Sequence, residues 1–206
     1  MILALIASSA IAVQGTASDF FPMEPGMKWT YESSGSASGS YSQEIGASTD
    51  VDGKTVTLVQ IKVKGKTVQS TFYETTSNGL YVLGHDAKKL FEKPQPVFIV
   101  ASKGATWEHT GPSPYEDDES GGLKLTGHSK SIGSRLYLGE KRDCLEVKTE
   151  AKIGLTGSTA TTFKTTTIYA KGLGMVEMDE SAQIGKTTNK RKVILTKFER
   201  AQVDGK

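Results

Sequence analysis

Cysteine is almost absent from this chain: its 206 residues contain one, Cys144. A single cysteine excludes an internal disulfide and leaves too few thiolates for a cysteine-based zinc site. Because this cysteine lies far from the first residues of the chain, we expect no lipid anchor on it. We predict that its thiol is a small buried hydrophobic group.

A surplus of one charge and long hydrophobic runs are also lacking. The 25 Lys and Arg residues nearly balance 23 Asp and Glu residues, for a formal net charge of +2, so nothing indicates a nucleic-acid partner. No segment reaches the ~20 apolar residues of a membrane-spanning helix. The one sustained apolar run, residues 1–13, leads into small residues, which predicts a secretory signal over residues 1–17 and a mature start at Ser18. A buried element of the domain is the alternative. We expect a secreted or periplasmic, soluble protein.

Motifs of catalysis are missing as well. The histidines His85, His109 and His128 are far apart and show no metal-ligand spacing. The chain has no nucleophile motif around a serine and no glycine-rich phosphate loop before a helix. We therefore predict no enzyme activity, no cofactor and no metal centre.

Alternation of apolar and polar residues is what the sequence does have. Val59, Ile61 and Val63 alternate with polar residues, and residues 159–169 are rich in threonine and aromatics. Pairs such as Asp52-Gly53 suit tight hairpin turns. This predicts an all-β fold, a single antiparallel meander of about eleven or twelve strands that curls into a barrel or half-barrel, with a sandwich as the alternative. The only helix we expect is a short turn at residues 86–91, before an extended connector at 92–96.

A repeat divides this predicted domain. Phe20, Gly26 and Trp29 recur 78 positions later as a second set of the same residues, Phe98, Gly104 and Trp107. We predict one β domain, residues 18–206, with halves of about 20–96 and 97–206. A recurring tryptophan after a glycine turn indicates a packing role in the building plan.

Three segments carry a resemblance to known proteins: Phe-Pro-Met-Glu-Pro-Gly-Met-Lys-Trp-Thr-Tyr at 21–31, Asp-Cys-Leu-Glu-Val at 143–147 and Tyr-Ala-Lys-Gly-Leu-Gly-Met-Val at 169–176. Together they resemble a group of bacterial exported proteins and lipoproteins of unknown function. Some such envelope proteins are similar to curved antiparallel half-barrels that carry lipid or lipoprotein, which implies an apolar concave face. This chain departs from the lipoproteins because it has no lipid-attachment cysteine near residue 1. The resemblance brings no catalytic residues.

Three groups of residues are candidates for a site. Aromatic side chains could line or support an apolar wall for a ligand, with core packing as the alternative; these are Trp29, Tyr31, Trp107 and Tyr169. Four consecutive acids could hold a cation weakly, or form a solvated loop; these are Glu116, Asp117, Asp118 and Glu119. Basic residues near the C-terminus could contact anionic groups, or serve as a soluble edge, with residue 191 facing away from 190 and 192; these are Lys186, Lys190, Arg191 and Lys192.

Together these observations predict a non-catalytic binding or carrier module of the cell envelope. Its partner would be a lipid or other apolar ligand, or an envelope protein. The alternative is a purely structural or protein-interaction domain of the cell envelope, with an enzyme as a distant third. A pocket of roughly 300 Å³ or more between the tryptophans favours the first, and an interior filled by side chains favours the second.

Overall fold

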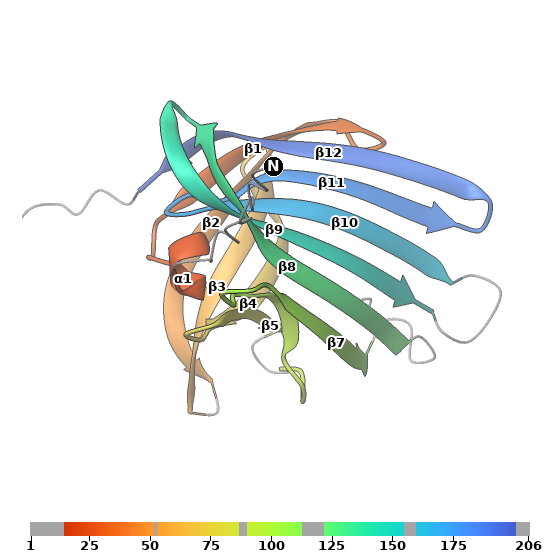
Figure 1. The fold of residues 1–206 in the computed structure, drawn as a ribbon. Coiled ribbons are helices and arrows are strands. Elements are labelled where there is room, and N and C mark those ends of the chain that lie inside the picture. The colour runs from red at the N-terminus through yellow and green to blue at the C-terminus, as the bar shows by residue number, and fades with distance from the viewer. Residues whose placement is uncertain (1–14, 52, 87–89, 113–121, 155–159, 201–206) are drawn as a thin grey trace, which may run out of the picture.

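Twelve antiparallel strands in a single sheet make up almost the whole fold (Figure 1). The computed structural model describes residues 15–51, 53–86, 90–112, 122–154 and 160–200. One short helix precedes the strands, α1 (Ala17–Phe20). The strands are β1 (Lys28–Gly35), β2 (Gly39–Val51), β3 (Lys54–Val63), β4 (Lys66–Thr75), β5 (Gly79–Gly84), β6 (Gln95–Ile99), β7 (Ala105–Pro112), β8 (Gly122–Tyr137), β9 (Glu140–Ile153), β10 (Thr161–Ala170), β11 (Gly174–Ile184) and β12 (Thr187–Glu199).

The sheet rolls up because the first strand pairs with the last. The order is β6-β5-β4-β3-β2-β1-β12-β11-β10-β9-β8-β7, so every neighbouring pair except β1 and β12 is consecutive in sequence. The two edge strands, β6 and β7, lie near each other on the opposite side, and there the Ser129 hydroxyl of β8 donates to the Ile99 carbonyl of β6. The prediction of an antiparallel meander of about eleven or twelve strands is confirmed, and the fold is a nearly closed barrel rather than a sandwich.

The two copies of the sequence repeat share a backbone conformation at their glycines. Gly26 and Gly104 adopt nearly the same left-handed conformation, with φ of 84° and 86°, which glycine adopts without a Cβ penalty. The two phenylalanines of the repeat differ, since Phe20 ends α1 and Phe98 lies in β6, but both side chains are buried. The repeated phenylalanines therefore share burial in the core but not secondary structure. The connector predicted at 92–96 runs into β6, and part of the predicted helical turn at 86–91 lies outside the described residues.

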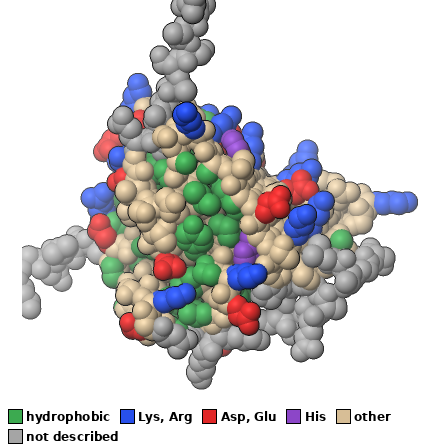
Figure 2. All heavy atoms as spheres, turned by 60° about the horizontal axis from the view of Figure 1, so that its bottom comes forward, with side chains coloured by type: hydrophobic (Ala, Val, Ile, Leu, Met, Phe, Trp, Pro, Cys, Tyr) green, Lys and Arg blue, Asp and Glu red, His purple; other side chains and the backbone are tan. Residues whose placement is uncertain are grey.

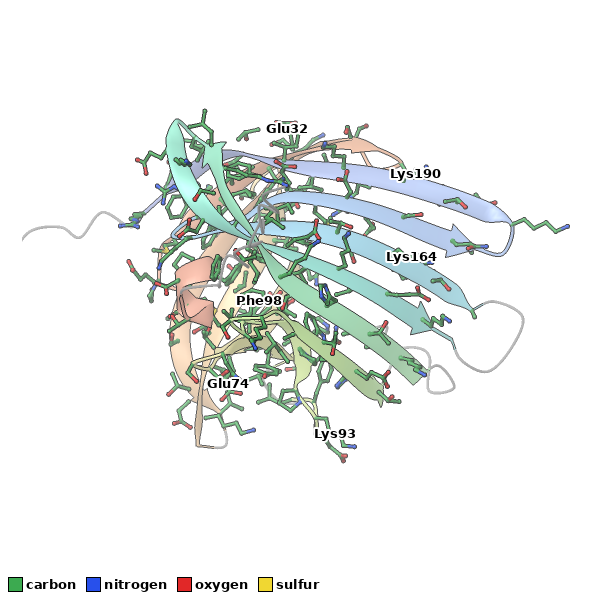
Figure 3. All side chains as sticks on the ribbon, in the orientation of Figure 1. Glu32, Glu74, Lys93, Phe98, Lys164 and Lys190 are labelled. Carbon is green, nitrogen blue, oxygen red and sulfur yellow. The ribbon has the colours of Figure 1, made fainter. Side chains whose placement is uncertain are left out.

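An aromatic cluster lies in the core of the barrel. Trp29, with no exposed surface, stacks between Phe21 at 5.7 Å and Phe198 at 5.4 Å between ring centroids. Its indole N–H donates to the Leu173 carbonyl, at the close of the second half. Phe98, which Figure 3 places inside the barrel near α1, contacts the Tyr169 ring at 4.7 Å. Side chains from the two halves therefore share one core.

The segment around α1 also packs on this core. Ala17 is buried, and the Asp19 carboxylate accepts a hydrogen bond from the Thr16 N–H at 2.8 Å. This backbone hydrogen bond is the main reason why the pKa of Asp19 is lowered. Ala17 is the last residue of the predicted signal, whose cleavage before Ser18 stays a prediction.

An ion-pair cluster on the first half makes stability depend on pH. Glu44 lies 2.8 Å from the Lys28 ammonium and also contacts the Lys62 ammonium. Hydrogen bonds from these lysines, Lys28 first, lower the pKa of Glu44 from its ordinary value of 4.5. Because the folded pKa is lowered, the stabilisation is present above pH 4.5 and is lost as pH falls through the folded pKa.

We expect Glu44→Gln to lower the free energy of unfolding by about 1 kcal/mol at neutral pH, as partly exposed ion pairs do. Urea titrations at a series of pH values should show the two proteins converging below pH 4.5. The control is Glu32→Gln, at an exposed position of β1. A Glu44→Gln deficit that persists unchanged in acid would contradict the ion-pair explanation.

Candidate functional site

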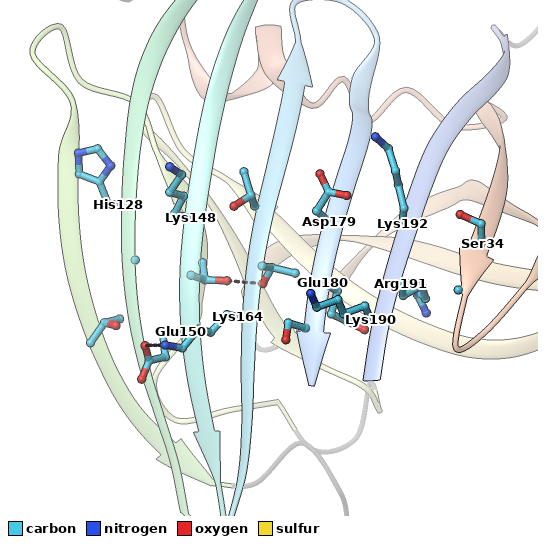
Figure 4. Close-up of a pocket in the computed structure, with 17 residues that line it drawn as sticks. Ser34, His128, Lys148, Glu150, Lys164, Asp179, Glu180, Lys190, Arg191 and Lys192 are labelled. Carbon is cyan, nitrogen blue, oxygen red and sulfur yellow. Dashed lines mark hydrogen bonds and ion pairs between the residues drawn. The ribbon is translucent and has the colours of Figure 1, made fainter. Parts of the chain in front are cut away.

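A groove of about 810 Å³ crosses β8 to β12 and the end of β1 (Figure 4). Its middle row consists of cross-strand partners, and Gly127 in this row pairs with Trp107 of β7. Partners in a sheet share a face, and Trp107 is buried in the barrel core. The side chains of this row therefore point inward, and its backbone forms the floor of the groove. The row is Gly127, Thr149, Thr165, Glu180, Arg191 and Gly35.

The walls of the groove come from the residues before and after the floor row. Neighbouring residues of a strand point to opposite faces, so these side chains project outward, and Figure 4 shows them as two rows. One wall consists of Ser34, Lys192, Asp179, Thr166, Lys148 and His128, and the other of Lys190, Ser181, Lys164, Glu150 and Thr126.

Cations outnumber anions in these walls. Four wall residues are lysines and two are acids, Glu150 and Asp179. The Lys164 ammonium lies 3.3 Å from the Glu150 carboxylate, so these charges largely offset each other. Lys190 and Lys192 are exposed on β12, and within the described ranges no carboxylate lies within 4.0 Å of either ammonium. The β12 end of the groove therefore offers two cations that can bind an anionic group.

Arg191 of the floor row shows that the side chains of β12 alternate between the interior and the groove. Burial raises the pKa of Tyr41, whose ring stacks on buried Tyr31 at 5.2 Å between centroids, and the positive charge of Arg191 acts in the opposite direction. Arg191 therefore lies near the barrel interior, while Lys190 and Lys192 face the groove. The predicted split of the basic cluster is confirmed, and Lys186 lies in the turn between β11 and β12.

The described part of the chain offers no metal-binding group of three or more histidine, cysteine or acidic side chains. His85 Nδ1 lies 3.2 Å from the Thr71 hydroxyl, and burial, then Lys93, lowers the pKa of His109. Cys144 is buried, as predicted, and its burial raises the pKa of the thiol. The acidic run Glu116 to Glu119 lies outside the described residues.

The four aromatic candidates are brought together, but inside the barrel. Trp29, Tyr31, Trp107 and Tyr169 all belong to the buried core, and none lines the groove. The Tyr31 hydroxyl donates to the Met175 carbonyl at 3.1 Å, and burial raises the pKa of both Tyr31 and Tyr169, so their phenols stay neutral. These contacts favour the packing alternative. A ligand at the four residues stays a prediction.

Sequence reasoning singled out Lys190 and Lys192 but missed the rest of the walls. Lys148, Lys164 and Asp179 belong to three different strands, and each looks like an ordinary exposed strand residue. Only the register of neighbouring strands places them along one groove. A pattern of lysines at outward positions in successive strands was the available signal.

On another face, hydrophobic side chains gather in the middle of the surface, with histidines at their margin (Figure 2). No described helix is long and apolar enough to cross a membrane.

Comparison with known proteins assigns no family. No protein-family model matches the chain, and no curated protein matches it. Two solved structures are similar over 91% of this chain and 100% of theirs. One is named "putative lipoprotein", from Parabacteroides distasonis, with 10% identity and a TM-score of 0.48. The other is named "putative exported protein with YmcC-like fold", from Bacteroides fragilis, with 11% identity and a TM-score of 0.47. At these values neither neighbour assigns a function or a site to this chain.

Proposed function

We propose that this chain is an exported, non-catalytic binding module of the bacterial cell envelope or exterior, and that it holds its partner in the outer groove. The groove of about 810 Å³ carries this proposal, because a side-chain-lined hollow of this size across five neighbouring strands can hold one side of an extended partner. The apolar run at residues 1–13 and the small residues after it support export.

The walls favour a partner with negatively charged groups. An extended chain lying across the strands would meet the Lys190 and Lys192 ammonium groups at one end, whereas Lys148 at the other end already lies 3.4 Å from the Glu146 carboxylate. Ammonium groups donate strong hydrogen bonds to carboxylate and phosphate oxygens. The first expectation, an apolar ligand inside the barrel, receives less support, because aromatic side chains pack there.

The test is a double charge reversal, Lys190→Glu with Lys192→Glu. We expect the unaltered protein to bind fluorescent poly-L-glutamate in an anisotropy titration, more weakly at high salt because exposed charges are screened. The double variant should bind at least about tenfold more weakly, since a tenfold loss needs only ~1.4 kcal/mol.

The matched control is Lys54→Glu with Lys66→Glu, which changes the net charge equally at exposed positions of β3 and β4. It should bind almost as the unaltered protein does. Equal losses in both double variants would show that overall charge alone attracts the polyanion, and would reject the groove as its site.

The second candidate is a protein-interaction domain without a small-molecule site. The aromatic side chains packed inside the barrel favour it, because they occupy part of the interior where a carried ligand would lie. An envelope protein that binds the Lys190→Glu, Lys192→Glu variant as tightly as the unaltered protein would favour this candidate over the groove.

A further inference from the structure

The hairpin that joins β8 to β9 has an exposed apolar tip. Leu136 is 71% exposed and Leu138 is 49% exposed, although leucine is most often buried. The turn consists of Leu138 and Gly139, both with positive φ, 48° and 84°. Such mirror-image turns prefer asparagine, aspartate or glycine, because a Cβ is unfavourable at positive φ. Leu138 is therefore unfavourable for two reasons: its Cβ is strained at positive φ, and its apolar side chain is exposed to water.

A second hairpin in the same barrel shows that the turn does not need leucine. Lys64 and Gly65 join β3 to β4 with φ of 50° and 77°, nearly the same geometry. There the first position carries a charged, exposed side chain. Leu138 differs from Lys64 because it adds an exposed apolar side chain to the same strained conformation, and this combination points to a role outside the fold. Leu138 is therefore a candidate contact residue.

The barrel holds this hairpin firmly while the leucines face outward. The register shifts between Ser131 and Ser134, and the hairpin projects beside β12 at the upper left of Figure 1. On its inner face the Tyr137 hydroxyl donates to the Glu177 carboxylate at 2.8 Å. The Arg142 guanidinium donates to the Lys171 carbonyl at 3.0 Å. The tip is thus presented by an anchored element.

Basic side chains slightly outnumber acidic ones in this hairpin, with Arg135, Lys141 and Arg142 against Glu140 and Asp143. The Glu140 carboxylate pairs with Arg142, and the Asp143 carboxylate accepts a hydrogen bond from the Ser134 hydroxyl at 2.6 Å. Lys141 lies directly opposite Leu136 in the ladder and is exposed, and no carboxylate of the described chain lies within 4.0 Å of its ammonium. Two exposed leucines beside an ammonium group can contact a layer whose interior is apolar and whose outer groups are anionic.

We propose that the β8–β9 tip inserts into the interfacial layer of a lipid bilayer and docks the barrel there reversibly. Two leucines cannot supply the ~1,000 Å² that a specific protein interface needs. A bilayer requires no complementary surface, and it binds small apolar groups more tightly when basic residues meet anionic headgroups. This docking involves none of the groove residues, so it goes beyond the proposed function.

The test uses the full chain and vesicles of equal parts phosphatidylcholine and phosphatidylglycerol in a flotation assay. Leu138→Asn should reduce vesicle binding at least about tenfold, the scale expected for the loss of one buried leucine. The same variant should raise the thermal unfolding midpoint, because asparagine accepts positive φ more readily. Loss of binding with a gain in stability cannot be explained by misfolding. Leu136→Ser, on the strand itself, should also lose binding.

The matched control is Lys64→Asn, which makes the same relief of strain at the other turn and should keep vesicle binding. Vesicle binding by Leu138→Asn equal to that of the unaltered protein would overturn the proposal. An unaltered protein that does not bind vesicles but self-associates through Leu138 would also overturn the proposal, because the tip would then bind a second copy of the chain.

Discussion

Replacing Trp29 by alanine is expected to lower the free energy of unfolding by about 3–5 kcal/mol, the cost of deleting a large buried aromatic side chain. Trp29 has no exposed surface and stacks on both Phe21 and Phe198. Its removal would leave a cavity between the two rings and an unpaired Leu173 carbonyl. Urea denaturation followed by circular dichroism measures the loss.

The repeated tryptophans allow a sharper comparison with phenylalanine. Trp29→Phe removes the indole hydrogen bond to Leu173, whereas the buried indole N–H of Trp107 has no partner among the described residues. Leaving a buried carbonyl unpaired costs about 1–3 kcal/mol. Trp29→Phe should therefore destabilise the barrel more than Trp107→Phe does. Equal losses at the two positions would contradict the assigned role of the hydrogen bond.

Gly127→Ala is expected to lower the free energy of unfolding by about 3 kcal/mol, at the upper end of overpacking costs. A Cβ on Gly127 would lie 2.1 Å from Cε2 of the Trp107 indole, so the buried ring or the backbone must move to accept it. The backbone of Gly127 is not in the left-handed region. The effect is therefore steric, and it acts between β8 and the edge strand β7.

A double-mutant cycle tests this explanation. In a Trp107→Leu background, Gly127→Ala should lower the free energy of unfolding much less. Residues in contact show interaction energies of about 0.5–3 kcal/mol in such cycles. The control is Gly46→Ala, where a Cβ would meet only the flexible Leu58 side chain at 3.3 Å. Gly127→Ala costs that stay the same in both backgrounds would place its strain elsewhere than on the Trp107 ring.

Local patterns predicted the barrel well because strands and turns depend on neighbouring residues. The alternation around Val59 and the glycine turns before Trp29 and Trp107 predicted strands, and the structure confirms them. Alternation also predicted that Lys190 and Lys192 share a face while Arg191 turns away.

The groove and the hairpin tip could not be predicted because they depend on register and exposure. A slip of one residue moves every side chain of a strand to the other face, and the ladder contains irregularities such as that between Ser131 and Ser134. The register of β9 and β10, which pairs Lys148 with Thr166 and Lys164 with Glu150, places the two lysines on opposite walls of the groove. Leu138 beside Gly139 reads as an ordinary apolar residue, and only its φ and its exposed surface mark it.

The pairing of β1 with β12 determines when this barrel can close. The indole of Trp29 and its acceptor, the Leu173 carbonyl, are separated by 144 positions, so much of the chain must be in place before this contact forms. Closing so large a loop is entropically costly, and sheets with distant pairings fold slowly. One edge of β1 therefore stays without its partner strand until the final strand docks. A chain that crosses a membrane unfolded would complete this barrel only after its last strand has emerged.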